Sequence, residues 1–149
     1  MNAFLLSIHV LAAILAIGPV AVAASMFPSA ARLASDDPEK AATLQVLHRT
    51  TRVYAVIGVL VPVFGLATGA RMGVLGDTWL IVSLILTAAA AAILVGLILP
   101  GQKRVVGALG SDQPVTVRLG MPTGMFNLLW AAVVVLMIYR PGSTTGVGW

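Results

Sequence analysis

Hydrophobic and polar residues are segregated along this chain into four long apolar runs separated by shorter polar segments. The runs cover about residues 3–24, 53–70, 79–99 and 123–139, and none of them contains Asp, Glu, Lys or Arg. About 20 apolar residues in a helix cross a bilayer core roughly 30 Å thick. Backbone groups in lipid must pair within their own segment, so each run is predicted to be a helix. The expected fold is all-α: one domain, residues 1–149, forming an antiparallel bundle of four transmembrane helices.

The composition supports a membrane protein and removes several kinds of chemistry. Of the 149 residues, 59% are hydrophobic and 9% are charged, whereas a soluble domain carries about 25% charged residues. The chain has no cysteine, which excludes disulfides, thiol nucleophiles and cysteine-bound zinc or iron–sulfur sites. No acidic residue lies inside a run, which argues against an ion-coupled transporter. We therefore expect no catalytic residue and no metal site, and favour a role other than an enzyme.

The distribution of cationic residues predicts the orientation of the bundle. Most of them lie in the first and third connections: Arg32, Lys40, Arg49, Arg52, Lys103, Arg104 and Arg118. By the positive-inside rule, these connections face the cytoplasm, and both termini lie outside a bacterial plasma membrane. The net charge of +4 then reflects this bias and attraction to the lipid bilayer, so no nucleic-acid partner is expected.

The first and third connections differ in the structure they predict. Ser35-Asp36-Asp37-Pro38-Glu39 is typical of a helix start. A cytoplasmic helix over about residues 37–52 is therefore predicted to run into the second span, with Arg49 and Arg52 at the lipid headgroups. This helix is either a solvated lead-in or a docking surface for a partner. Residues 101–122 contain several Gly and Pro, which predicts an irregular connection with a short turn around 105–109.

Small residues four apart mark faces where helices can approach closely. The second run offers Gly65 and Gly69, and the third offers Ala88, Ala92 and Gly96. These stripes serve either packing within the bundle or contact with another chain. Pro19 and Pro62 are expected to bend the first and second helices, because proline removes an amide donor and clashes one turn back.

His9 is the one ionisable side chain inside the runs, which makes it a candidate functional residue. It shares a helix face with Ala12, Ala13 and Ala16 and is therefore expected to point into the bundle. Two interpretations are open: an axial haem ligand, or a neutral imidazole hydrogen-bonded to a neighbouring helix. His9 is expected in the outer half of the membrane and His48 at the cytoplasmic start of the second helix, too far away for both to bind one iron. A haem at His9 would therefore have one histidine ligand, add Met125 or Met137, or lie between two chains.

Several segments resemble a family of small four-helix bacterial membrane proteins of unknown function, best represented in actinobacteria. They are FLLSIHVLAAILAIGPVAVAASMFP, LHRTTRVYAVIGVLVPVFGLATG, and the start (WL) and exit (ILPGQ) of the third run. More distantly, the chain is similar to the haem-containing membrane protoporphyrinogen oxidases and the copper-resistance D membrane domain. Shared landmarks include a histidine–valine pair in the first helix and Phe126-Asn127 in the fourth. The haem family's pattern implies that His9 is the ligand.

These observations lead to two functional expectations. The first is an accessory or stabilising subunit of a larger membrane complex, without a cofactor, which contacts a membrane-protein partner or a second copy of itself. The lack of catalytic groups and the small-residue stripes favour it. The second is a membrane redox or porphyrin-oxidising enzyme that binds haem b through His9.

Overall fold

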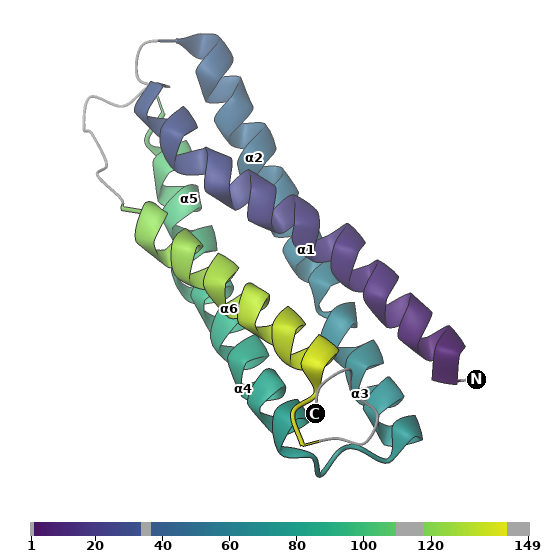
Figure 1. Ribbon diagram of the computed structural model, residues 1–149. Coiled ribbons are helices and arrows are strands. Elements are labelled where there is room, and N and C mark those ends of the chain that lie inside the picture. Colours follow the sequence, from purple (N-terminus) through teal and green to yellow (C-terminus); the bar gives the residue numbers. More distant parts are fainter. Residues whose placement is uncertain (1, 34–36, 110–117, 143–149) are drawn as a thin grey trace.

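The computed structural model describes residues 2–33, 37–109 and 118–142, and every regular element in these ranges is a helix. The elements are α1 (Asn2–Leu33), α2 (Pro38–Gly58), α3 (Leu60–Met72), α4 (Thr78–Ile93), η1 (Leu94–Ile98), α5 (Leu99–Gly107) and α6 (Gly120–Tyr139). They form four rods, because α2 continues into α3 and α4 continues through η1 into α5 (Figure 1). All four rods are long and apolar enough to cross a membrane. The predicted all-α four-helix fold is confirmed.

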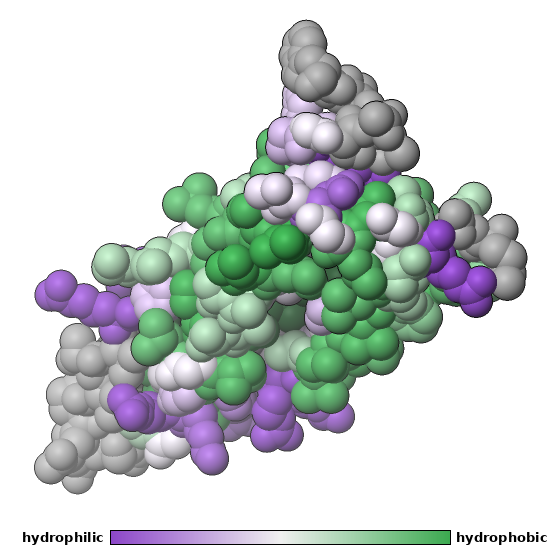
Figure 2. Space-filling model, turned by 90° about the horizontal axis from the view of Figure 1, so that it is seen from below, coloured by the Kyte–Doolittle hydropathy of each residue, from purple (hydrophilic) through white to green (hydrophobic). Residues whose placement is uncertain are grey.

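The outer surface of the bundle is hydrophobic. Large apolar side chains are exposed on every rod, for example Leu15 at 65%, Val56 at 70% and Leu128 at 73%. On the face shown in Figure 2, hydrophobic side chains cover the middle and hydrophilic ones lie toward the margins. Exposed apolar surface of this extent is unfavourable in water and matches contact with lipid tails. The chain is therefore a multi-pass membrane protein.

Proline affects two of the rods differently. Pro62 has no N–H to donate to the carbonyl of Gly58, and α2 ends at Gly58. The next residue, Val59, makes a tighter turn, because its N–H donates to the carbonyl of Val56, three residues back, at 3.2 Å. The second rod is therefore interrupted where a proline at position 62 disturbs the helix. In contrast, α1 continues as one helix through both Pro19 and Pro28.

The third rod extends further than the sequence indicated. Its helix continues past Pro100 to Gly107. The expectation of an irregular connection from residue 101 was therefore wrong for residues 101–107, which are helical. The five residues of η1 form a π-helix, in which Leu99 N–H donates to Leu94 C=O, five residues back. This wider turn precedes Pro100, which occupies the first turn of α5, where a helix tolerates a missing donor. A local change of helical register thus lets the rod pass a proline.

The first two rods also extend beyond the apolar runs and pack on each other. The Asp37 carboxylate caps α2 by accepting the Glu39 N–H at 2.9 Å, which confirms a helix start at Pro38. Ser35 and Asp36 lie outside the described residues. Phe27 of α1 and Leu44 of α2 are both fully buried beside Leu119. The lead-in helix is therefore partly covered by its own chain, and only its outer face is open to solvent or a partner.

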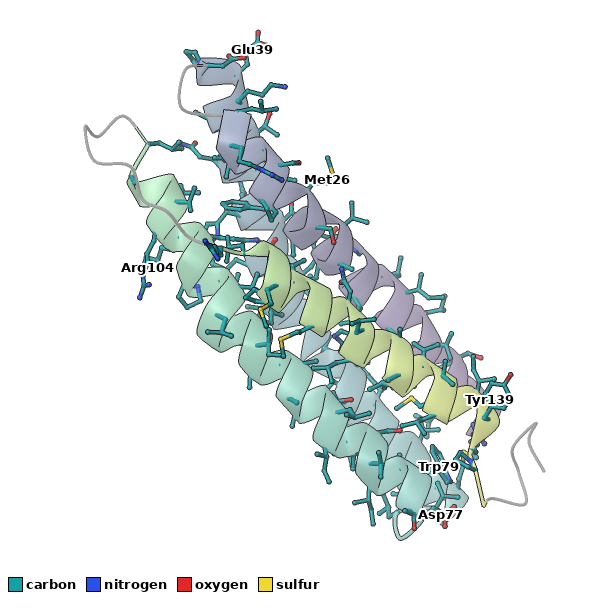
Figure 3. All side chains as sticks on the ribbon, turned by 60° about the vertical axis from the view of Figure 1, so that its left-hand side comes forward. Met26, Glu39, Asp77, Trp79, Arg104 and Tyr139 are labelled. Carbon is teal, nitrogen blue, oxygen red and sulfur yellow. The ribbon has the colours of Figure 1, made fainter. Side chains whose placement is uncertain are left out.

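The bundle has two ends, which we name after a buried residue at each. The Trp79 end holds the starts of α1 and α4 and the end of α6 (Figure 3). The second connection makes its turn there through Gly73, whose φ of +71° favours glycine. The Gln102 end holds α5 and the first turns of α2 and α6.

Candidate functional site

An apolar groove lies between α1 and α6, with α3 and α4 behind it. It consists of two adjoining cavities of about 420 and 720 Å³, within the range of about 300–1,000 Å³ that is usual for ligand pockets. The two cavities share His9, Ala13, Ile14, Gly65, Leu80, Val134 and Met137. The first extends toward Thr87 and Trp130, and the second extends toward Trp79 and Arg140. His9 therefore stands where the two cavities meet.

Most hydroxyl groups within the spans are already paired. Each donates to the carbonyl four residues earlier in its own helix, at 2.7–2.8 Å: Ser7, Thr68, Ser83 and Thr87. Such bonds satisfy a polar group inside a bilayer at little cost. Thr68 and Thr87 line the groove but keep their protons for their own helices. In the middle of the groove, where the two cavities meet, the polar side chain is therefore that of His9.

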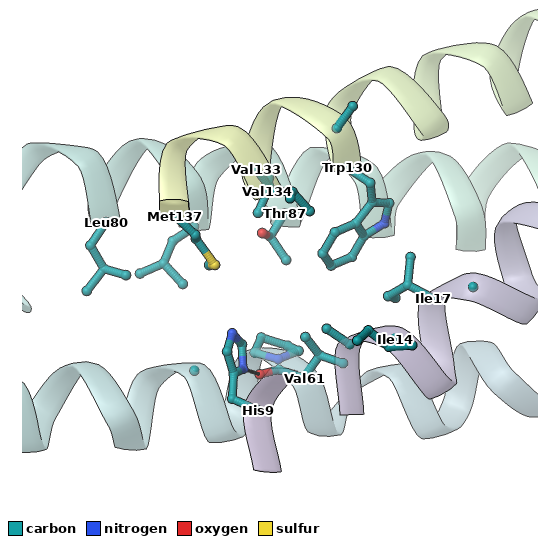
Figure 4. A pocket seen from close by; sticks show the side chains of 16 residues that line it. His9, Ile14, Ile17, Val61, Leu80, Thr87, Trp130, Val133, Val134 and Met137 are labelled. Atoms are coloured by element: carbon teal, nitrogen blue, oxygen red, sulfur yellow. Dashed lines mark hydrogen bonds between the residues drawn. The ribbon is translucent and has the colours of Figure 1, made fainter. Parts of the chain in front are cut away.

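The His9 imidazole crosses from α1 to α3. Its Nδ1 lies 2.9 Å from the carbonyl oxygen of Val61, and the side chain is 8% exposed. A carbonyl oxygen only accepts, so Nδ1 carries the proton; in the neutral ring, Nε2 then has a free lone pair. Figure 4 shows the second ring nitrogen turned away from Val61 and into the cavity. Metal-bound histidines commonly have this arrangement, with one nitrogen held by a carbonyl and the other available.

Gly65 forms the surface on which the imidazole rests. A Cβ atom at this position would lie 2.8 Å from Cε1 and 3.3 Å from Nδ1 of His9. At Gly69, one turn later, a Cβ atom would lie 3.1 Å from Cδ2 of Leu80. The predicted glycine pair therefore lies inside the bundle, where Gly65 contacts the functional candidate and Gly69 contacts α4.

The wall opposite His9 is formed by α6. Met137 lines both cavities, and its side chain extends into the space above the His9 ring in Figure 4. Met125, the other methionine expected as a ligand, is 45% exposed and lines neither cavity. The structure thus brings one of the two methionines to the groove that holds His9.

A polar side chain of α6, that of Asn127, lies outside the groove. The Asn127 amide donates to the Ser25 hydroxyl at 3.0 Å and so links α6 to α1. Thr123 Oγ1, Asn127 Oδ1 and Trp130 Nε1 are buried and lack a hydrogen-bond partner within the described ranges. Only Trp130 of these three lines one of the two cavities, through the ring that packs edge-to-face on Phe126.

Arg140 and Trp79 close the groove at the Trp79 end. The guanidinium of Arg140 lies over the Trp79 ring, with 5.3 Å from Cζ to the ring centroid, and its Nε donates to the Met137 carbonyl at 3.1 Å. The indole N–H of Trp79 donates to the Asp77 carboxylate at 3.0 Å. Arg140 has φ of +46°, a left-handed conformation that is uncommon outside glycine and asparagine. A strained backbone therefore places a cation at the edge of an apolar groove.

The second histidine belongs to a separate cluster at the Gln102 end. His48 Nδ1 lies 3.1 Å from Gln102 Oε1, and the Gln102 amide lies 3.5 Å from Thr51 Oγ1. Both Gln102 and Thr51 are fully buried. This cluster joins α2 to α5, and His48 lines neither cavity at His9. The two histidines therefore belong to different polar clusters of the bundle.

The remaining candidate residues face outward. The stripe on the third rod, Ala88, Ala92 and Gly96, is exposed, and a Cβ atom added to Gly96 would meet nothing within 4 Å. These residues therefore make no packing face within the described part of the chain. Arg49 and Arg52 are also exposed, on the outer side of α2.

Comparison with protein-family models, curated protein sequences and solved structures finds no match for this chain.

Three features of the site were absent from the sequence interpretation: the Val61 carbonyl, the Trp130 ring and the Arg140–Trp79 pair. A backbone acceptor has no sequence signal, because any residue carries one. Arg140 and Trp79 were visible only as residues at span ends, and no spacing rule connects positions so far apart. The groove depends on how α1 crosses α3, which only the folded chain reveals.

Proposed function

We propose that this protein binds haem b in the groove between α1 and α6, with Nε2 of His9 as an axial ligand to the iron. The observation that carries the proposal is the orientation of His9. Its Nδ1 proton is engaged by the Val61 carbonyl, which directs the other nitrogen into an apolar cavity. A buried histidine that only satisfied its own polarity would not need a cavity beside its free nitrogen.

The groove suits a flat, apolar cofactor. Its walls are aliphatic and aromatic, and its two cavities adjoin at His9. Met137 would supply a thioether from the opposite wall, and histidine together with methionine holds haem iron in other proteins. The resemblance of the histidine–valine pair in the first helix to the haem-containing membrane family was an expectation from the sequence, and it would select the same residue. His9 and Met137 therefore give the donor set that a haem site needs.

The chain's own residues set the properties of such a site. The Val61 carbonyl orients the imidazole and increases the donor strength of Nε2. Ile14, Leu80 and Val134 line the cavity beside the His9 imidazole. They would keep water away from this imidazole and lower the local dielectric constant. Haem, when bound, would supply one-electron redox chemistry. Among the described residues that line the first cavity, His9 is the acid–base group, and its part would be to hold and orient the cofactor.

An absorption spectrum tests the proposal. The chain should be produced in cells supplied with a haem precursor and purified in mild detergent. We expect a Soret band with about one haem per chain, lost in His9→Ala and retained in His48→Ala, the matched control at the opposite end. A wild-type protein without a Soret band, or a band unchanged in His9→Ala, would contradict haem binding at this residue.

We further propose that the bundle lies in a bacterial plasma membrane with both termini outside. The cationic first and third connections support this orientation. The Trp79 end would then face outward and the Gln102 end would face the cytoplasm. Haem at His9 would lie in the outer half of the bilayer.

A second function, an accessory subunit of a membrane complex, is favoured by one specific observation. Ala88, Ala92 and Gly96 form an exposed stripe on the third rod, and small residues let a second helix approach closely in lipid. Purification in mild detergent from the native membrane should then yield a stoichiometric complex, which Ala92→Leu disrupts. A wild-type protein that elutes as a single monomeric chain would contradict this role.

A further inference from the structure

The groove carries a charged side chain at one end, where Arg140 lines the second cavity. Its middle is lined by aliphatic residues around His9, while the second cavity reaches Arg140, Trp79 and the paired hydroxyl of Thr68. Among the described residues that line the two cavities, Arg140 carries the positive charge. A ligand that fills this groove therefore meets hydrocarbon along most of its length and a cation at the Trp79 end.

The backbone conformation of Arg140 and its contacts with Trp79 and Met137 help to hold it at this edge. The αL backbone at the end of α6 turns the side chain back toward the bundle. The Trp79 ring supports the guanidinium from one side, and the Nε proton is engaged by the Met137 carbonyl. Met137 also lines the wall opposite His9. One helix end therefore positions both a sulfur donor and a cation along the same groove.

A non-glycine residue in the αL conformation is strained, and strain of this kind is concentrated at functional positions. Glycine or asparagine would end α6 at lower cost. Arginine contributes here what neither of them has, a planar cation with several donors that matches a carboxylate. In a low-dielectric surrounding, such a charge-assisted hydrogen bond is among the stronger ones.

We propose that Arg140 receives the carboxylate edge of the ligand, so that a porphyrin enters with its propionate groups toward the Trp79 end and its apolar edge toward Trp130. This inference rests on the proposed haem site at His9 and assigns the ligand's direction in the groove. The chemical class follows from the lining: a flat apolar ring with acidic groups on one edge. Arg140 is a binding residue and acts independently of the iron.

Haem and its dimethyl ester distinguish the contribution of the carboxylates from that of the iron and ring. The apoprotein in lipid nanodiscs should be titrated with each compound, and affinity read from the Soret band and from haem transfer to an acceptor protein. Wild-type protein is expected to prefer haem over the ester by about 10- to 100-fold, the range of hydrogen bonds to charged groups. Arg140→Gln should bind both compounds about equally.

The control for charge is Arg71→Gln. Arg71 is an exposed cation in the last turn of α3 and lines neither cavity, so this variant should keep the wild-type preference. Arg140→Gly is a control for folding, because it removes the side chain and relieves the αL strain. It should remain folded by circular dichroism and lose the preference for haem.

The outcomes separate this inference from the haem proposal itself. If His9-dependent Soret bands appear with both compounds but Arg140→Gln keeps the wild-type preference, the assigned direction is wrong and the haem site stands. If the wild-type protein binds haem and the dimethyl ester with equal affinity, the assigned direction is also wrong and the haem site stands. If neither compound gives a His9-dependent band, both proposals are overturned.

Discussion

Gly65 determines how closely the His9 imidazole can approach α3. The ring lies in hydrogen-bond contact with Val61 because no side chain stands at position 65. The GxxxG spacing of the second run was interpreted as a general packing motif. In the structure, the first glycine of this pair, Gly65, has a more specific role, because it makes room for the His9 imidazole from α1.

Replacing Gly65 with alanine should therefore displace the imidazole. The new Cβ would lie 2.8 Å from Cε1 of His9, and overpacking of this kind costs about 1–3 kcal/mol. We expect haem affinity to fall about tenfold or more, measured by Soret titration. Gly58→Ala, at which a Cβ would lie 3.6 Å from Ile17, should bind haem normally. Equal affinities of the two variants would refute a positioning role for Gly65.

At the scale of single elements, helix ends and breaks were the least predictable features. Pro28 and Pro100 are local stop signals, yet α1 and the third rod continue beyond them. On either side of Pro28, packing of Phe27 and of Ala30 and Ala31 in the cluster that contains Leu44 favours continuation of the helix. Before Pro100, the π-turn of η1 adjusts the register. Tertiary packing thus overrides local propensity at both positions.

The elements whose signal is strong over many residues were predicted well. The four apolar runs became the four rods, and Asp37 caps α2 ahead of Pro38 as the sequence pattern indicates. His9 faces inward, as its position among alanines on α1 suggested. Its surroundings could not be predicted, because Val61 contacts it and Met137 lines the same cavities only through the crossing of three separate helices.

The cluster at the Gln102 end is expected to hold α5 against α2. Gln102→Leu removes a fully buried amide that contacts both His48 and Thr51. The loss should lower the free energy of unfolding by about 1–2 kcal/mol, measured by denaturant titration in detergent micelles. Gln45→Leu, on the exposed side of α2, is the matched control. A Gln102→Leu variant as stable as this control would show that the cluster contributes little.

For the whole molecule, the central question is which end of the bundle faces the cytoplasm. The chain lacks cysteine, so single cysteines can be introduced without background. In intact cells, a membrane-impermeant maleimide should label Gly76→Cys, in the turn at the Trp79 end, but not Gln45→Cys on α2. After cell lysis, both should react. Labelling of Gln45→Cys alone in intact cells would reverse the proposed orientation.

The arrangement of the rods also bears on how a ligand reaches the groove. Exposed residues of α1 and α6, such as Ile14 and Val134, form part of its lining. A groove bordered by lipid-facing residues is open toward the bilayer. A hydrophobic cofactor would therefore reach His9 from the membrane and not through the connections at the Gln102 end.

The most direct test of the account is replacement of the His9 side chain by free imidazole. His9→Gly removes the ring and leaves a space beside Gly65 that imidazole can fill. We predict that this variant, folded by circular dichroism, loses the wild-type Soret spectrum with added haem and regains it with millimolar imidazole. Haem binding by His9→Gly with an unchanged spectrum, or no effect of imidazole on the folded variant, would contradict axial ligation by His9.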